Sequence, residues 1–311
     1  MPILFEKLTE LVKYLTLNPE MDSFRLLHGR GRCFAGLEFV NVDFFQPVLI
    51  LTCYKEPPEF WLAGIANFLR DKLSPQLECV LVQNRYLPNA PSEILLGKLP
   101  EQVYARRNNL RFHLHLNSQQ NAGFFLDMES GRQWLEQHAQ GKRVLNLFAY
   151  TCAFSVIAIA ASAEIVVNVD MSSSALNLGR SNHQLNGLPK QRSEFLAENI
   201  MKSWGRIKRR GPYDLVIIDP PSYQPGSFIA EKDYAKIIRR LPELMPDGGL
   251  VLACLNAPEL SDEYLKDLFQ EHLSAAIFVE RIVPHKDFPD VNSGQQLKLL
   301  TYNIPAIALA S

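Results

Sequence analysis

The sequence predicts an α/β protein in which a mostly parallel, seven-stranded sheet follows a smaller N-terminal α/β domain. From Arg143 onward, short apolar runs and helical segments alternate in the order β-α-β-α-β-α-β-α-β-α-β-β. The runs are apolar along their whole length, which is typical of strands that are buried on both faces. This alternation favours a parallel sheet with helices on both sides. A chain of 311 residues with a formal net charge of −1 is long enough for one or two globular domains.

The N-terminal domain is expected over residues 1–118. Its predicted elements are a helix over 5–15, strands over 48–52 and 78–83, a helix over 60–73 and an exposed hairpin over 102–117. The hairpin carries Arg106 and Arg107, which we take as candidate RNA contacts. Arg25, Arg30 and Arg32 either contact phosphates or belong to a solvated Arg-Gly turn.

The second domain is expected over residues 119–311. We expect strands over 144–148, 165–170, 195–198, 213–219 and 250–255, with a terminal pair over 275–282 and 296–303. The helices are expected over 132–140, 155–161, 175–185, 200–210, 234–244 and 261–272. The helix that starts at 175 should stop at Asn186-Gly187, because this pair is a helix-ending signal.

The segment from Arg143 to Asp170 is the predicted cofactor cradle. Its second strand ends on Asp170, and an acid in that place can accept hydrogen bonds from both hydroxyls of an adenosine ribose. The alternative is that Asp170 only caps the helix that follows. The loop at 148–154 contains no glycine, whereas a dinucleotide pyrophosphate needs glycines for a close backbone approach. S-adenosylmethionine has no phosphate, so it is the adenosine cofactor that fits.

Glu198 ends the third strand and is a candidate partner for the adenine amino group, although it could equally be a plain surface charge. The fourth strand runs into Asp219-Pro220-Pro221-Ser222-Tyr223. Two prolines cannot continue a strand ladder, so the chain must turn beside the cofactor. This turn would form a rigid lip on which Asp219 is a hydrogen-bond acceptor and Tyr223 an aromatic face, and the two could hold a planar nitrogenous group. A purely structural turn would also explain the prolines.

The strongest basic cluster lies on the predicted helix over 200–210. It combines one aromatic side chain with four cations: Trp204, Arg206, Lys208, Arg209 and Arg210. This composition suits contact with an RNA backbone and stacking on a base, but a solvated charged helix end has the same pattern.

Other classes of site find little support. The five cysteines are scattered without a C-x-x-C pair, so we expect reduced thiols and no metal. No apolar run is long enough to span a bilayer, and the N-terminus lacks the pattern of a signal peptide. We therefore expect a cytoplasmic protein.

Several motifs together resemble one known family. They are GFFLD at 123–127, NLFAYT at 146–151, VDMS at 169–172, DPPSY at 219–223 and HKDFP at 285–289. In combination they resemble the S-adenosylmethionine-dependent 23S ribosomal RNA methyltransferases of the large subunit. The branch that makes 7-methylguanosine is the closer one, and the 5-methylcytosine branch is a cousin.

The resemblance implies a Rossmann-like class I methyltransferase domain behind a smaller RNA-facing α/β domain. It also implies site residues in two groups. The cofactor would be bound by Asp127, Asn146, Phe148, Tyr150, Thr151, Asp170, Met171, Glu198 and Asp219. The target base would be placed by Asp219, Pro220, Ser222 and Tyr223, so that the rate comes mainly from positioning.

Two departures from the family pattern matter. Cys152-Ala153 stands where members commonly have glycine, and a positive φ at Cys152 would cost on the order of 1 kcal/mol. Asn256 stands where the cytosine branch has the cysteine that adds to the ring. Cys254 on the same strand is more simply a buried core thiol, so the resemblance favours methylation of a guanine-N7-like nitrogen.

Three functions follow from these observations. The first is methylation of a base nitrogen in large-subunit ribosomal RNA. The second is methylation of a protein or small-molecule nitrogen, for which the DPPSY lip would serve equally well. The third is a non-catalytic RNA-binding or ribosome-assembly protein, motivated by the departure at Cys152.

Overall fold

The computed structural model describes residues 2–18, 20–116, 121–221, 223–224 and 228–306, and of residues 223 and 224 it describes the backbone alone. The chain divides into two compact units. Unit 1 comprises Met1–Asp127 together with His285–Asn292, and unit 2 comprises Met128–Pro284 and Ser293–Ser311. The predicted boundary between residues 118 and 119 stays a prediction. No local pattern in the sequence predicts that the segment 285–292 belongs to the N-terminal unit.

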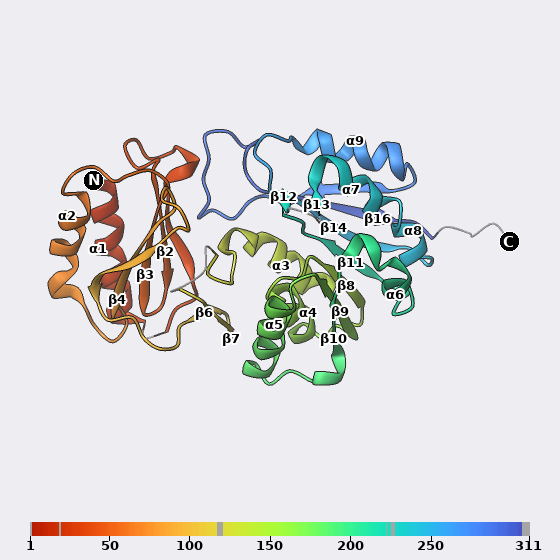
Figure 1. The fold of residues 1–311 in the computed structure, drawn as a ribbon, viewed down its shortest axis with the longest axis horizontal. Coiled ribbons are helices and arrows are strands. Elements are labelled where there is room, and N and C mark those ends of the chain that lie inside the picture. Colours follow the sequence, from red (N-terminus) through yellow and green to blue (C-terminus); the bar gives the residue numbers. More distant parts are fainter. Residues whose placement is uncertain (1, 19, 117–120, 222, 225–227, 307–311) are drawn as a thin grey trace. The chain divides into compact units, whose positions relative to one another are not determined.

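Unit 1 is a five-stranded sheet with two helices on one face (Figure 1). Its elements are α1 (Pro2–Leu17), β1 (Phe24–His28), β2 (Val40–Phe45), β3 (Val48–Cys53), α2 (Trp61–Leu69), β4 (Cys79–Asn84) and β5 (Ser92–Gly97), followed by the hairpin β6 (Tyr104–Arg107) and β7 (Leu110–His113). The strand order is β1-β2-β3-β4-β5, and only β3 and β4 are parallel, because α2 makes the crossover between them. Leucines at 4, 8, 11 and 15 give α1 one apolar stripe, which packs on this sheet.

The segment 285–292 is held on β1 and the turn after it. Val291 N donates to Gly31 O at 2.9 Å, and the Phe288 ring lies 5.4 Å from the His28 ring. A Cβ at Gly31 would lie 1.8 Å from the carbonyl oxygen of Pro289, so only glycine allows this approach. The HKDFP motif is therefore part of unit 1.

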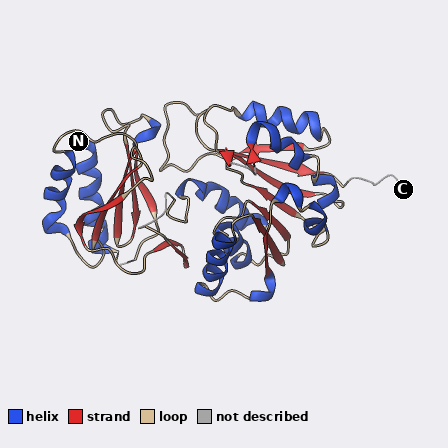
Figure 2. Cartoon of the chain, viewed as in Figure 1, coloured by secondary structure: helices blue, strands red, loops and turns tan. Residues whose placement is uncertain are grey.

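Unit 2 contains the predicted seven-stranded sheet, with helices on both of its sides (Figure 2). Its elements are α3 (Glu129–His138), β8 (Arg143–Leu147), α4 (Ala153–Ala160), β9 (Ile165–Asp170), α5 (Ser173–Leu185), β10 (Ser193–Ala197), α6 (Trp204–Lys208), β11 (Leu215–Ile218), β12 (Tyr223–Gln224), β13 (Phe228–Ile229), α7 (Ala230–Ile238), α8 (Leu241–Leu244), β14 (Gly249–Leu255), α9 (Asp262–His272), β15 (Ile277–Arg281) and β16 (Lys298–Ile304). The strand order is β10-β9-β8-β11-β14-β16-β15. In this sheet β16 is the strand that runs opposite to the other six, which confirms the mostly parallel α/β fold.

The core of unit 2 is split by this sheet. One face packs against α3 and α4 through side chains such as Val144, Leu215 and Ile217, and the other packs against α6 to α9 through Leu145 and Val216. Successive residues of a strand point to opposite faces, so both faces of each central strand must be apolar. Because β8, β9, β10, β11 and β14 are parallel, their carboxyl ends meet at one edge of the sheet, where a ligand is expected in such folds.

Two helices predicted in unit 2 are each divided into two shorter elements. The helix expected over 200–210 is a short 3-10 turn, Ile200–Lys202, followed by α6. The helix expected over 234–244 begins at Ala230 and breaks after Ile238, where α7 gives way to α8. Pro242 explains this break, because it has no N–H to donate and its ring would collide with the carbonyl four residues earlier.

Within the described residues, no helix is long and apolar enough to cross a membrane.

Candidate active site

The loop between β8 and α4 has a strained backbone. Phe148, Tyr150 and Cys152 have φ values of 59°, 46° and 60° and are not glycines. Each such residue costs about 1–2 kcal/mol, because its Cβ approaches the following carbonyl oxygen. Cys152 thus has the positive φ whose cost was considered for this departure from the family pattern. Strain of this kind persists only where the surroundings hold it.

Asp170, the last residue of β9, holds this loop. Its Oδ2 accepts a hydrogen bond from Tyr150 N at 2.8 Å, and its Oδ1 accepts one from Ser172 N at 2.8 Å. The helix cap is Ser172, whose hydroxyl accepts from Ala175 N at 3.2 Å, so the alternative of Asp170 as the cap of α5 is wrong. Burial, reinforced by the Asp170 charge, raises the pKa of Tyr150.

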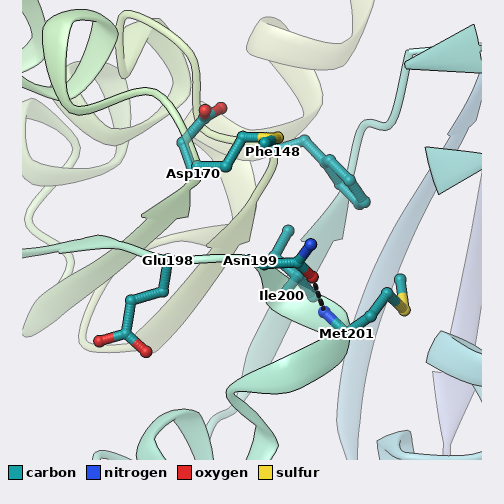
Figure 3. A pocket seen from close by; sticks show the side chains of 7 residues that line it. Phe148, Asp170, Glu198, Asn199, Ile200 and Met201 are labelled. Carbon is teal, nitrogen blue, oxygen red and sulfur yellow. Dashed lines mark hydrogen bonds between the residues drawn. The ribbon is translucent and has the colours of Figure 1, made fainter. Parts of the chain in front are cut away.

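A pocket lies at the carboxyl ends of β8, β9 and β10 (Figure 3). It is lined by Phe148, Asp170, Met171, Glu198, Asn199, Ile200 and Met201. Four of these seven residues were predicted as cofactor contacts: Phe148, Asp170, Met171 and Glu198. The structure thus brings together side chains that are up to 53 residues apart in the sequence, from 148 to 201.

Asn199, Ile200 and Met201 complete this pocket and were missed by sequence reasoning. Asn199 Oδ1 accepts from Met201 N at 3.0 Å, which leaves the amide nitrogen on the side of Phe148 and Asp170 in Figure 3. The carboxylate of Glu198 instead points away from the other labelled side chains and pairs with Arg206. Asn199 directly follows the strand predicted over 195–198, and this position is the sequence signal that could have identified it.

The helix α5 locks the strained loop from behind. Asn182 is fully buried and donates its Nδ2 to Thr151 O at 3.0 Å. A Cβ at Gly179 would lie 2.4 Å from Cys152 Sγ, so the cysteine side chain occupies the space that this glycine leaves. Burial raises the pKa of the Cys152 thiol well above its ordinary value. Cys152 is therefore a packing residue.

A chain of buried polar side chains connects the strands to α4 and α5. Asn146 Nδ2 donates to Asn168 Oδ1 at 2.9 Å, and Asn168 Nδ2 donates to Ser155 Oγ at 2.9 Å. Ser155 Oγ lies 3.0 Å from His183 Nε2, and His183 Nδ1 lies 3.1 Å from Ser193 Oγ. Burial lowers the pKa of His183 to about 4, so its ring is neutral at pH 7. Asn146 is 1% exposed, and its side chain belongs to this series of hydrogen-bonded polar residues.

The Asp-Pro-Pro segment follows β11 at the same edge of the sheet. Pro220 is buried and Pro221 is exposed. Ser222 lies outside the described residues, and of Tyr223 only the backbone is described, in β12. Phe228 of β13, which pairs with β12, packs its ring 4.9 Å from the ring of Phe148. The segment after the prolines therefore adjoins the cofactor loop.

Two buried polar side chains brace the neighbouring strand end. The Tyr234 hydroxyl lies 3.1 Å from Cys254 O and 3.4 Å from Ile218 O, so it joins the ends of β14 and β11. The Lys298 side chain is fully buried and donates Nζ to Ala257 O at 2.7 Å. Burial lowers the pKa of Lys298. Between these two anchors stands Asn256, which is exposed.

The comparison with protein families agrees with this geometry. A family described as S-adenosylmethionine-dependent methyltransferase matches residues 24–303. The chain belongs to this family. The cofactor of the methyltransferase is accordingly S-adenosylmethionine, and the reading as a non-catalytic RNA-binding protein is set aside.

Two relatives carry the name of a ribosomal RNA methyltransferase. Ribosomal RNA large subunit methyltransferase I of Erwinia tasmaniensis is 27% identical over 297 residues, which are 91% of this chain and 74% of that protein. The protein of the same name from Aeromonas salmonicida is 28% identical over 227 residues, 70% of this chain and 57% of that protein. The methyltransferase thus spans 57–74% of the length of these relatives.

Solved structures confirm the fold. The crystal structure of SMU.776, a candidate methyltransferase complexed with SAH, has a TM-score of 0.81 at 26% identity and covers 97% of this chain and 80% of its own. The tRNA m1G37 methyltransferase of M. jannaschii has a TM-score of 0.60 at 16% identity, covering 85% of this chain and 72% of its own. The second likeness concerns the fold alone.

Other predicted residues of the methyltransferase belong to unit 1 or are already engaged in ion pairs. Asp127 belongs to unit 1, where its charge acts on Arg25. Arg106 pairs with Glu20 at 3.2 Å, and Arg107 is 4% exposed. We do not retain Arg107 as an RNA contact, because a buried guanidinium does not reach a phosphate backbone.

The basic cluster on α6 is largely compensated by acids. Arg206 pairs with Glu198, Lys208 lies 3.5 Å from Glu243, and Arg210 pairs with Glu194 at 2.7 Å. Trp204 is partly buried and packs against the core of unit 2. The RNA contacts expected at these residues and at Arg209 stay predictions. The described residues contain no group of acids, cysteines and histidines that could hold a metal ion.

Proposed function

We propose that this methyltransferase transfers the methyl group to a base nitrogen, guanine-N7-like, of large-subunit ribosomal RNA. The observation that carries the choice of nitrogen concerns the cysteines. Methylation at C5 of a pyrimidine needs a thiolate that adds to the ring. Cys152 and Cys254, the cysteines of unit 2, are both fully buried, and the exposed residue at the end of β14 is Asn256. A base nitrogen needs no such activation, because its lone pair is the nucleophile.

The pocket fits an adenosine that carries no phosphate. Its loop is free of glycine, so it offers no close approach for a pyrophosphate, while Asp170 presents carboxylate oxygens at a strand end. In our proposal Asp170 accepts from the ribose hydroxyls, Phe148 and Ile200 flank the adenine, and the amide of Asn199 contacts its edge. Asn146, Tyr150 and Thr151 act through the loop, whose shape the buried polar chain and Asp170 maintain. Asp127 stays a proposed contact for the amino-acid end.

Positioning is the main task of the protein in the transfer. When bound, S-adenosylmethionine would supply an electrophilic methyl group: the lone pair of the base nitrogen bonds to the methyl carbon, the carbon–sulfur bond breaks, and SAH leaves as a neutral thioether. Asp219, Pro220, Ser222 and Tyr223 are proposed to hold the target base against that methyl group, with Asn256 on the neighbouring strand end. A base that is helical in its substrate must be extruded first, which costs a few kcal/mol. Ribosomal RNA as substrate would place the protein in the cytoplasm.

Calorimetry with S-adenosylmethionine and SAH tests the cofactor part. We expect micromolar binding to the wild type and a loss of about tenfold or more in Asp170→Ala, since hydrogen bonds to a charged group contribute about 1.5–3 kcal/mol each. Asn199→Ala should weaken binding more than Glu198→Ala, because the Glu198 carboxylate pairs with Arg206. Equal effects of these two variants would contradict the role given to Asn199.

Nucleoside mass spectrometry of ribosomal RNA from hosts with and without the protein tests the substrate part. A methylated base nitrogen that disappears with the protein would support the proposal, and an unchanged set of nucleosides would refute it. A second candidate substrate is a nitrogen of a protein or small molecule. The ion pairs made by the cations of α6 favour it, because a paired cation is less available to an RNA backbone. Methyl acceptance in cell extract that survives RNase treatment would identify that case.

A further inference from the structure

A built cluster of cations and an aromatic ring lies at one edge of the unit 1 sheet. Tyr54 follows β3 and Arg85 follows β4, two parallel strands that pair Cys53 with Asn84. Arg85 N donates to Cys53 O at 2.8 Å, which fixes the two residues side by side. Arg30 reaches the same ring from the turn after β1. Its guanidinium carbon lies 4.4 Å from the centre of the Tyr54 ring, and that of Arg85 lies 5.8 Å from it.

A buried amide ties the parts of this cluster together. Asn41 of β2 is 2% exposed. Its Oδ1 accepts from Arg30 N at 3.3 Å, and its Nδ2 lies 3.4 Å from the Tyr54 hydroxyl. The backbone at Arg30 and the ring beneath its side chain are therefore positioned by one residue of the core. Such a ring attracts a guanidinium through a cation–π interaction.

Arg30 differs from the cations of α6 in its charge balance. Arg30 is exposed, and within the described part of the chain it makes no ion pair with an acid. Arg85 donates Nε to Gln83 Oε1 at 3.1 Å and Nη2 to Asn121 Oδ1 at 2.8 Å. Next to Arg85, Tyr86 and Leu87 are 37% and 42% exposed. This edge of the unit 1 sheet thus combines the cations Arg30 and Arg85, which contact the Tyr54 ring, with the exposed apolar surface of Tyr86 and Leu87.

We propose that the Arg30–Tyr54–Arg85 cluster is an RNA-binding surface of unit 1, and that it takes single-stranded RNA. This inference rests on the proposed function and names the part of the protein that would engage its substrate. A guanidinium held over a ring by its charge keeps N–H groups for a phosphate, which it can bind in a bidentate manner. Unstacked bases can stack on guanidinium planes and on exposed aromatic rings, which duplex RNA does not offer.

The full-length protein and a fluorescein-labelled, mixed-sequence single-stranded RNA provide the test. Arg30→Ala should raise Kd about tenfold and lower the slope of log K against log salt by about 1. Arg70→Ala is the matched control, because it removes the same charge from an exposed arginine of the same unit whose recorded partner is the neutral Asn67. Tyr54→Phe should retain RNA affinity, whereas Tyr54→Leu should lose part of it, because only the first keeps the ring.

Two results would overturn the proposal. One is an Arg30→Ala affinity within twofold of that of Arg70→Ala. The other is displacement of RNA by polyglutamate at equal charge concentration with the same dependence on Arg30, which would assign the surface to an acidic protein partner. SAH titration of each variant should match the wild type. If the wild type itself binds no SAH, the proposed methyl transfer fails, while the RNA measurement still decides the surface.

Discussion

The contact between Cys152 and Gly179 allows a double-mutant test of how the cofactor loop is held. A Cβ at position 179 would lie 2.4 Å from Cys152 Sγ and 2.9 Å from its Cβ. Replacing glycine by alanine inside a helix normally stabilises a protein by roughly 0.8–1 kcal/mol. Here we expect Gly179→Ala to lower the free energy of unfolding by about 1–3 kcal/mol, as in other overpacked cores.

Cys152→Gly removes the atoms that cause this collision. Glycine accepts the φ of 60° without strain, which gains about 1 kcal/mol. The loss of the buried thiol and the greater freedom of glycine in the unfolded chain oppose this gain by a similar amount. Cys152→Gly alone should therefore change stability by no more than about 1 kcal/mol. In that background Gly179→Ala should stabilise by the roughly 0.8–1 kcal/mol usual in a helix, which gives a coupling energy of about 2–4 kcal/mol between the two sites.

Denaturant unfolding of the four proteins measures this coupling, and SAH titration reports on the loop. Gly179→Ala should also weaken SAH binding, because the displaced cysteine belongs to the strained loop, and the double variant should recover it. Additive effects, or a Gly179→Ala variant that is more stable in both backgrounds, would refute the packing argument.

Three further predictions concern buried polar groups. The folded-state pKa of His183, about 4, lies below the unfolded value, so the unfolded state binds the proton first and stability should fall by up to about 3 kcal/mol between pH 6.5 and 4; denaturant midpoints across this range should change less in His183→Gln. Lys298→Met should leave SAH affinity unchanged but slow RNase-sensitive methyl transfer about tenfold, because Ala257 loses its anchor, and unchanged transfer rates would contradict this. Tyr234→Phe should lower the free energy of unfolding by about 1–2 kcal/mol, since Cys254 O loses a buried partner, whereas a change below about 0.5 kcal/mol would argue against that bond.

The strands of unit 2 could be predicted from the sequence because their signal is local. Apolar runs such as 165–170 and 250–255 coincide with β9 and β14 to within one residue. β2 of unit 1 escaped prediction although all six of its residues are buried, because Asn41 and Asp43 give it the look of a half-exposed strand. Asp43 is buried because it pairs with Arg25 at 2.7 Å, a tertiary contact that no local pattern contains.

The site shows the same division between local and nonlocal information. Asp170 could be predicted to line this pocket because a carboxylate at a strand end is a local feature. Our proposal of Asn199 rather than Glu198 as the adenine contact depends on side-chain direction, because Arg206 of α6 binds the Glu198 carboxylate. The placement of 285–292 on unit 1 likewise depends on the close approach of Pro289 to Gly31. Hydrogen-bond partners and backbone approach, rather than residue type, determine these positions.

The strained loop explains why Asp170 should matter for more than its ribose contact. Three left-handed residues at 148, 150 and 152 cost about 3 kcal/mol or more together. The hydrogen bond from Tyr150 N to Asp170 Oδ2, at about 1.5–3 kcal/mol, offsets part of this cost before any ligand is present. The loop is therefore partly preorganised, and the cofactor need supply less of the free energy that orders it. An alanine at 170 would remove a ligand contact and release the strain at once, so its effect on SAH affinity should exceed that of any other single side chain in the pocket.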